Sequence, residues 1–176
     1  MNRRALTLTL TLALAAASLA ITMSGCMGRS DTQAAAVTEV NISTLEVAAD
    51  PQAAADAIYA TVENCKNEKL DAAGLGSFYN ISSVDTEQFL VYRTDPASKL
   101  CDLAIILPKE DKRDRIRESL QLYKEKRMAE FKDYDLFDAH KIAEGAVIYD
   151  QGDYLVMLML PDNESAQELI NAHIPQ

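Results

Sequence analysis

The chain contains few of the residues from which catalytic and metal sites are usually built. Its 176 residues include two histidines, three cysteines and no tryptophan. His140 and His173 do not form a His-x-x-x-His pair, the spacing typical of a zinc-binding helix. There is also no Gly-x-Ser-x-Gly elbow, no glycine-rich phosphate loop and no Cys-x-x-Cys motif. We therefore expect no metal, no cofactor and no enzymatic activity.

Positive charge is also scarce. The sequence has 17 Lys and Arg against 27 Asp and Glu, a net charge of −10. Such a protein is repelled by nucleic acid and by anionic headgroups. The one basic cluster, residues 109–117, alternates with acidic residues, and pairs such as Asp111–Arg115 and Asp114–Arg117 lie at helical contact spacing. We interpret this cluster as a solvated, self-compensated helix face, so nucleic acid is not an expected partner.

A long apolar run is found at the N-terminus. Arg3 and Arg4 precede the uncharged residues 5–23, and the run closes on residues 23–26, MSGC. A basic start, an apolar core and small residues before the cut are typical of a secretory signal peptide. The closing four residues resemble a bacterial lipobox. This pattern predicts that residues 1–25 are a lipoprotein signal peptide and that Cys26 is lipidated and becomes the mature N-terminus.

A transmembrane helix and an ordinary secretory signal are the two alternative interpretations of this N-terminal run. A transmembrane helix needs ~20 apolar residues, but Ser and Thr dilute the run and no basic cluster follows it. An ordinary secretory signal, cleaved without lipidation, would leave Cys26 as a free thiol. Lipidation is the favoured interpretation, because it accounts for Cys26; two or more acyl chains would then hold the protein stably at a membrane. We expect a cell-membrane protein, lipid-anchored and facing outside the cytoplasm.

Removal of residues 1–25 leaves 151 residues, of which 15 are Lys or Arg and 27 are Asp or Glu. Residues 26–49 are rich in Ala, Thr, Ser and Val, and we expect a lipidated N-terminus with a flexible tether. Within it, residues 37–47 are a candidate edge strand. Residues 50–176 are long enough to form a single domain with its own core.

Apolar periodicity in residues 50–176 predicts the order helix, strand, strand, helix, strand, strand, helix. The predicted ranges are 51–67, 87–94, 100–107, 110–132, 146–149, 154–160 and 163–172. Two hairpins separated by a long helix favour an α+β domain, a mainly antiparallel sheet of about four strands with helices packed on it. Gly74 and Gly76 favour a turn or loop between the first two elements. Residues 134–144 are either irregular or a short helix, with Phe137 as a candidate buried contact.

Three residues are candidates for a structural or binding role. Cys65 and Cys101 remain after lipidation of Cys26, and in an exported chain they are either a disulfide or two buried thiols. A disulfide requires the end of the first helix to lie beside the start of the second strand. Arg127 lies in the apolar stripe of the long helix. We interpret Arg127 as a side chain that extends its charge to the rim, with contact to an anionic ligand or a carboxylate as the alternative.

The order of segments resembles that of a known family. After the lipobox and an Ala-rich spacer come "DAIYATV", "EQFLVYR" and "CDLAIILPK", then a charged helix ending in "FKDY" and the hairpin "GAVIYDQGDYLVMLMLPD". This layout is similar to small bacterial lipoproteins that share the domain of unknown function 4358, over about residues 50–172. The resemblance implies an exported, membrane-tethered domain without an assigned activity, and no catalytic residue follows from it.

The anchor, the tether and the lack of reactive clusters together favour one function. We expect a non-enzymatic binding or interaction module at the bacterial cell envelope, with the membrane contacted through the lipid and an envelope protein or peptide as partner. Two alternatives stay open. One is an envelope hydrolase whose site the sequence does not reveal, and the other is a structural subunit with an exposed apolar patch.

Overall fold

The computed structural model describes residues 48–133 and 135–176. The predicted signal peptide, Cys26, the candidate strand at 37–47 and nearly all of the predicted tether lie outside the described residues. Within the described part, none of the helices combines the length and the apolar character that crossing a bilayer requires.

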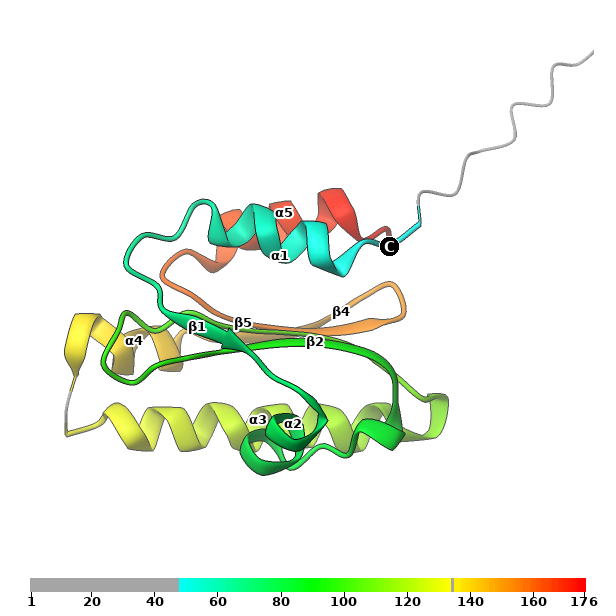
Figure 1. Cartoon of the computed structure of the whole chain (residues 1–176), viewed down its shortest axis with the longest axis horizontal. Helices are drawn as coiled ribbons and strands as arrows, with labels where there is room; N and C mark the ends of the chain where they lie inside the picture. Colours follow the sequence, from blue (N-terminus) through cyan, green and yellow to red (C-terminus); the bar gives the residue numbers. More distant parts are fainter. Residues whose placement is uncertain (1–47, 134) are drawn as a thin grey trace, which may run out of the picture. The chain divides into compact units, whose positions relative to one another are not determined.

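A five-stranded antiparallel sheet forms the centre of the domain (Figure 1). Its strand order is β1-β2-β3-β5-β4. The strands are β1 (Asn67–Lys69), β2 (Thr86–Thr94), β3 (Asp102–Pro108), β4 (Val147–Gln151) and β5 (Tyr154–Met159). The two predicted hairpins are β2–β3 and β4–β5, and they join through β3 and β5. The predicted count of four strands is wrong by one, because β1 is a three-residue polar edge strand that carries no apolar alternation.

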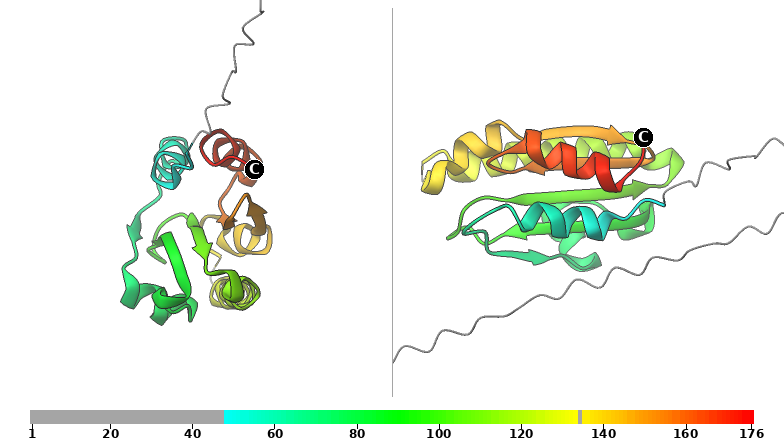
Figure 2. Two further views of the ribbon diagram at one scale, coloured as in Figure 1. Left: turned by 90° about the vertical axis from the view of Figure 1, so that its right-hand side faces the viewer. Right: turned by 90° about the horizontal axis from the view of Figure 1, so that it is seen from above.

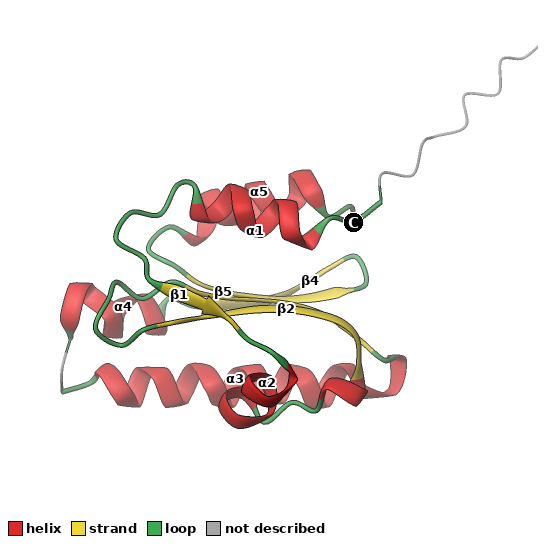
Figure 3. Ribbon diagram, in the orientation of Figure 1, coloured by secondary structure: helices red, strands yellow, loops and turns green. Residues whose placement is uncertain are grey.

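Helices cover both faces of this sheet, so the domain has three layers (Figures 1 and 2). One face carries α1 (Pro51–Tyr59) and α5 (Asn163–His173), and the other carries α2 (Ala72–Tyr79), α3 (Arg113–Phe131) and α4 (Ala139–Glu144). Short 3₁₀ turns lie at Ser83–Asp85, Glu110–Lys112 and Leu136–Asp138. The predicted α+β class is confirmed, but α2 adds to the three predicted helices (Figure 3). Of the two alternatives for residues 134–144, the structure has a short helix, α4.

Strand β3 is central and supplies side chains to both cores. Leu103 and Ile105 face α1 and α5, whereas Ala104 and Ile106 face α3, and all four are at most 1% exposed. Burial of one Leu or Ile side chain stabilises a fold by about 1.5–3 kcal/mol. A strand that is covered by helices on each side needs apolar side chains on both faces, and β3 has them.

The first helix is shorter than predicted. Asp50 caps it by accepting a hydrogen bond from the Ala53 amide at 2.9 Å, with Pro51 in the first turn, as the sequence indicates. The helix ends at Tyr59 rather than at residue 67. Thr61 donates its hydroxyl to the Ile58 carbonyl at 2.7 Å, a local bond that competes with helix continuation.

The segment predicted as a turn or loop contains the helix α2, so that prediction is wrong. Asp71 caps α2 by accepting from the Gly74 amide at 2.8 Å. A Cβ atom at Gly74 would lie 3.2 Å from the Leu70 side chain, so glycine permits close packing here rather than a turn. Tyr79, at the end of α2, is 1% exposed and anchors the helix to the core.

The basic cluster at residues 109–117 is self-compensated at Lys112, which pairs with Asp111 at 2.6 Å, but the prediction is wrong for its arginines. Arg113 and Arg117 each form an ion pair with Asp150 of β4 at 2.6 Å, and Arg115 lies 3.8 Å from Asp85. Burial alone would raise the pKa of Asp150, but the two guanidinium groups hold it below its ordinary value. These pairs connect α3 to the β4–β5 hairpin because they join elements that are distant in the sequence.

Candidate functional site

The candidate site lies at one end of the sheet, where β2 turns into β3. We call residues Asp95–Lys99 of this turn the hairpin loop. Three features meet there: a disulfide, a buried ion-pair network beneath the loop, and open grooves beside it.

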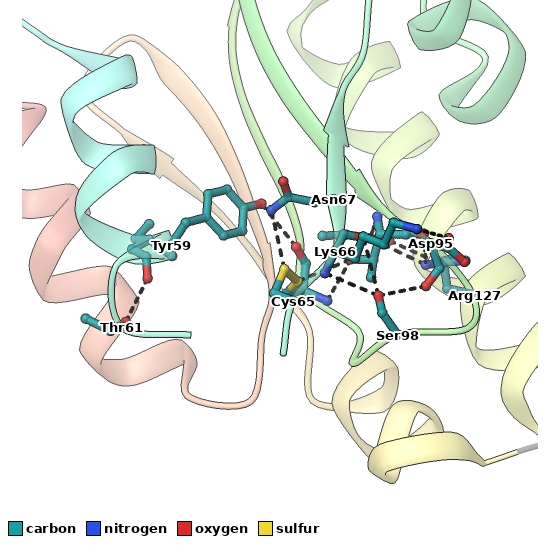
Figure 4. Close-up of a disulfide and its surroundings, with 12 residues drawn as sticks. Tyr59, Thr61, Cys65, Lys66, Asn67, Asp95, Ser98 and Arg127 are labelled. Carbon is teal, nitrogen blue, oxygen red and sulfur yellow. Dashed lines mark hydrogen bonds and ion pairs between the residues drawn. A yellow bond between two sulfur atoms is a disulfide. The ribbon is translucent and has the colours of Figure 1, made fainter. Parts of the chain in front are cut away.

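The disulfide joins Cys65 to Cys101, with 6.2 Å between their Cα atoms (Figure 4). Cys65 lies in the segment that follows α1, and Cys101 directly precedes β3. The end of the first helix therefore lies beside the start of the second predicted strand, as a bridge requires. Of the two alternatives for these cysteines, the structure has the disulfide and not two buried thiols. The Tyr59 hydroxyl donates to the Cys101 carbonyl at 3.1 Å, which ties the end of α1 to the same point.

Hydrogen bonds fix the hairpin loop against the segment that carries Cys65. The Asp95 amide donates to the Lys66 carbonyl at 2.9 Å, and the Ser98 hydroxyl contacts both backbone groups of Lys66 at 3.3 Å. The Ala97 amide donates to the Asp95 carboxylate at 2.9 Å and, as the largest influence, lowers the pKa of that group. These bonds attach the hairpin loop to Lys66, which directly follows Cys65. The disulfide therefore helps to fix the position of the loop.

A buried ion pair lies beneath the loop. The Arg127 Nε donates to Asp102 Oδ2 at 2.9 Å, and the two side chains are 1% and 0% exposed. A second nitrogen of Arg127 donates to Glu130 at 2.8 Å, and a third lies 3.4 Å from the Thr94 carbonyl. The interpretation of Arg127 as a side chain that reaches the rim is therefore wrong. It pairs with a carboxylate that comes from a different element, and solvent does not reach it.

Further hydrogen bonds complete this network. Asp102 accepts from the Tyr123 hydroxyl at 2.6 Å and from the Thr94 amide at 2.7 Å. Tyr79 stacks on Tyr123 with ring centroids 3.8 Å apart, and its buried hydroxyl has no hydrogen-bond partner among the described residues. Burial would lower the pKa of Arg127, but the attraction of Asp102 outweighs it and the pKa is raised. The network is closed to ligands, so we assign it to positioning Thr94 and Asp102 at the two ends of the hairpin loop.

Two open grooves border the loop at Lys99. The first has a volume of about 400 Å³ and lies between the end of α1 and the start of α5, with Ile58 and Val62 in its wall. The second, of about 350 Å³, lies beside α4, with Phe137 and Ile142 in its wall. Both share Lys99, Leu160 and Pro161. We call these two neighbouring grooves, taken together, the Lys99 groove.

Phe137 stands at the rim of the second groove and is 53% exposed. The prediction that it is a buried contact is wrong, because Ala139, Ile142 and Ala143 of α4 fill the core at this place instead. Phe137 and Asp138 both have left-handed backbone conformations, with φ of 55° and 59°. Such conformations cost of order 1–3 kcal/mol each and are often found at binding sites.

The other predicted candidates do not converge on this site. Across residues 48–133 and 135–176, no group of three or more His, Cys, Asp or Glu side chains is placed to hold a metal ion. His140 contributes its backbone amide to an Asp135 carboxylate, at 2.8 Å. Sequence reasoning missed Lys99, because a lysine in a hairpin turn is ordinary and its position beside both grooves is visible only in three dimensions.

The comparisons with known proteins give one match. A family model described as Domain of unknown function (DUF4358) matches residues 59–160. No curated protein and no solved structure matches the chain. The matched region includes both disulfide cysteines, Arg127 and the hairpin loop, and it ends before α5.

Proposed function

Because the chain belongs to the DUF4358 family, whose function is unknown, we propose a function from the geometry of the domain: it is a lipid-anchored, extracytoplasmic binding module of the bacterial cell envelope. It binds a protein or peptide partner in the Lys99 groove and catalyses no reaction.

The Lys99 groove is the observation that carries this proposal. Its walls combine apolar side chains with charged ones of both signs, and a strained segment holds Phe137 at its rim. The charged residues are Lys99, Lys141, Glu63, Asp138 and Asp162. Binding sites are typically mostly apolar concavities with a few polar groups that orient the ligand. The disulfide and the Arg127–Asp102 pair keep the loop that carries Lys99 in place, which reduces the ordering cost of binding.

The position of the groove within the domain suits a tethered module. The Asp50 amide donates to the His173 carbonyl at 2.9 Å, so the described residues begin and end side by side. Figure 1 shows both of these ends on one side of the domain and α4 on the other, where the groove lies. An anchor at Cys26 would therefore leave the groove facing away from the point at which the tether enters the domain.

No observation favours the envelope hydrolase considered from the sequence. A general acid or base must come within ~3 Å of the proton that it transfers. Among the described residues, the buried charged side chains are Asp102 and Arg127. They are enclosed in the core and form an ion pair with each other. Among the described residues, the exposed large apolar side chains are Val84, Leu122 and Phe137, each on a different element.

The test is capture of a partner from intact cells after mild crosslinking. Phe137→Ser removes the aromatic rim of the groove, and Leu122→Ser is its matched control on α3, because the two side chains are 53% and 54% exposed. We expect the wild-type protein and Leu122→Ser to capture the same partner and Phe137→Ser to lose it. Equal capture by both variants would contradict the proposal, as would a wild-type protein that captures nothing.

A further inference from the structure

A third open groove borders the hairpin loop and shares no lining residue with the Lys99 groove. Its volume is about 470 Å³, within the range of about 300–1,000 Å³ that is typical of ligand sites. The loop supplies Pro96 and Ala97, the end of α3 supplies Glu130 and Phe131, and Leu136 comes from the turn before α4. Among the described residues, the lining thus consists of four apolar side chains and one carboxylate. We call it the Glu130 groove.

Glu130 carries the excess negative charge of the buried network. The single positive charge of Arg127 is shared between two carboxylates, Asp102 at 2.9 Å and Glu130 at 2.8 Å. Asp102 is 0% exposed and has no second ion pair among the described residues, so it needs the charge of Arg127. One cation against two carboxylates leaves a charge of −1. Asp102 and Arg127 are enclosed, whereas the Glu130 side chain is 35% exposed, so the excess charge is presented in the groove.

The segments that border the groove are also acidic. Residues 95–97 and 130–136 contain one cation, Lys132, against four carboxylates. These carboxylates belong to Asp95, Glu130, Asp133 and Asp135. Lys66 pairs with Asp95 at 3.6 Å, and with Lys66 counted the net charge of this surface is −2. The Lys99 groove carries charges of both signs, but the complement of the Glu130 groove is a cation.

The geometry at Glu130 favours an ammonium over a guanidinium. Oε2 of Glu130 accepts from Arg127, and Oε1 accepts no hydrogen bond from the described residues. A guanidinium binds best as a fork to both oxygens of a carboxylate, and Arg127 already occupies one of them. An ammonium needs only one oxygen. The methylenes of a lysine side chain also pack well on apolar walls such as those of Phe131 and Leu136, while the charge stays at the rim.

From these observations we infer that the Glu130 groove binds a lysine side chain of a partner protein or peptide. Its methylenes lie between the hairpin loop and Leu136, and its ammonium donates to Oε1 of Glu130. The groove is open, so a free small amine would remain largely in water, whereas a lysine that belongs to a partner is also held by the contacts around it. This is a second contact surface, and the inference does not depend on the partner of the Lys99 groove.

The test uses two peptide libraries and the full chain. In one library, acetylated and amidated pentapeptides carry a central lysine between randomised uncharged residues; in the other, acetyl-lysine replaces the lysine and removes its charge. Binding is measured by fluorescence anisotropy at low ionic strength. We expect the lysine library to bind about three- to tenfold more tightly. The difference should shrink at ~0.5 M salt, because the ion pair is partly exposed.

A matched pair of variants locates the effect. Glu130→Gln keeps the shape of the side chain and removes its charge, and we expect it to reduce binding of the lysine library to the level of the acetyl-lysine library. Glu118→Gln is the control, because Glu118 is an exposed glutamate of α3 that lines none of the three grooves and its replacement changes the net charge equally. It should leave the difference between the libraries unchanged.

A second pair of variants does not touch the buried network. Ala97 is exposed in the hairpin loop and lines the groove, so a new side chain there should not disturb the core. We expect Ala97→Lys to weaken binding of the lysine library and Ala97→Glu to strengthen it. Thermal unfolding shows whether Glu130→Gln retains the fold; if it does not, the Ala97 pair decides.

Equal binding of the two libraries, no binding of either, or an equal loss in Glu118→Gln and Glu130→Gln would overturn the inference. An equal effect of the two Ala97 variants would overturn it as well. Self-association of the protein that Glu130→Gln abolishes would assign the groove to a second copy of the chain and not to a lysine of a partner. None of these results affects the Lys99 groove, which Phe137→Ser tests separately.

Discussion

Replacement of Arg127 by methionine should lower the free energy of unfolding by about 3–5 kcal/mol. Methionine retains much of the aliphatic volume of the arginine, so the change tests the charge rather than the packing. It leaves Asp102, which is 0% exposed, without the cation that lies 2.9 Å from its Oδ2. Loss of one partner from a buried pair leaves the other charge uncompensated, and that is the main contribution to the expected loss.

The second half of this experiment is Asp102→Asn. Asparagine has nearly the same shape, and its carbonyl can still accept one of the two hydrogen bonds that Tyr123 and Thr94 donate to the carboxylate at 2.6 and 2.7 Å. In the double variant with Arg127→Met, neither charge is left unpaired. We therefore expect the double variant to lose about 1–3 kcal/mol less than the sum of the two single losses.

Equilibrium unfolding in urea measures these values, provided that the dependence of the free energy on urea concentration is unchanged among the variants. A loss below about 1 kcal/mol for Arg127→Met would refute the reasoning, because a solvated surface pair behaves in this way. Strict additivity in the double variant would refute it as well, since it would mean that the two groups do not interact.

Three further predictions concern the anchor, the disulfide and the buried tyrosines. Cys26→Ser should abolish incorporation of labelled fatty acid and move the protein from the membrane fraction to the soluble fraction; unchanged fractionation would contradict lipidation at this residue. The paired change Cys65→Ser and Cys101→Ser should lower the free energy of unfolding by about 4 kcal/mol, because the bridge closes a sequence separation of 36 residues; an unchanged urea midpoint would contradict this. Burial raises the pKa of Tyr79 well above its ordinary value. Because the unfolded chain then releases this proton first, the contribution of Tyr79 to stability should be constant below pH ~10 and fall as the pH rises further; a Tyr79→Phe variant whose stability falls as steeply above that pH as that of the wild type would argue against it.

The regular parts of the fold could be predicted from the sequence. The alternation around Leu103 and Ile105 located the central strand, and the long helix followed from its apolar stripe. Strand β1 could not be predicted, because an edge strand of three polar residues has no periodicity and is defined by its pairing with β2. The helix α2 was hidden by its two glycines, of which Gly74 packs closely against Leu70.

The candidate site could be predicted only in part. Arg127 was recognised as a charge in an apolar stripe, but its partner lies 25 residues away on another element. A signal for the pair did exist, since Asp102 is an acidic residue on an otherwise apolar face of a strand, and two such exceptions of opposite charge can be expected to meet. The Lys99 groove has no comparable signal, because it forms where loops from distant parts of the chain come together.

The central claim is that a partner binds at the Lys99 groove, and site-specific photocrosslinking in intact cells tests it most directly. A photoreactive amino acid is placed at Phe137, at the rim of the groove, or at Leu122, which is equally exposed on α3. The account predicts a discrete crosslinked product from position 137 and none from position 122. Equal crosslinking from both positions, or none from position 137, would contradict it.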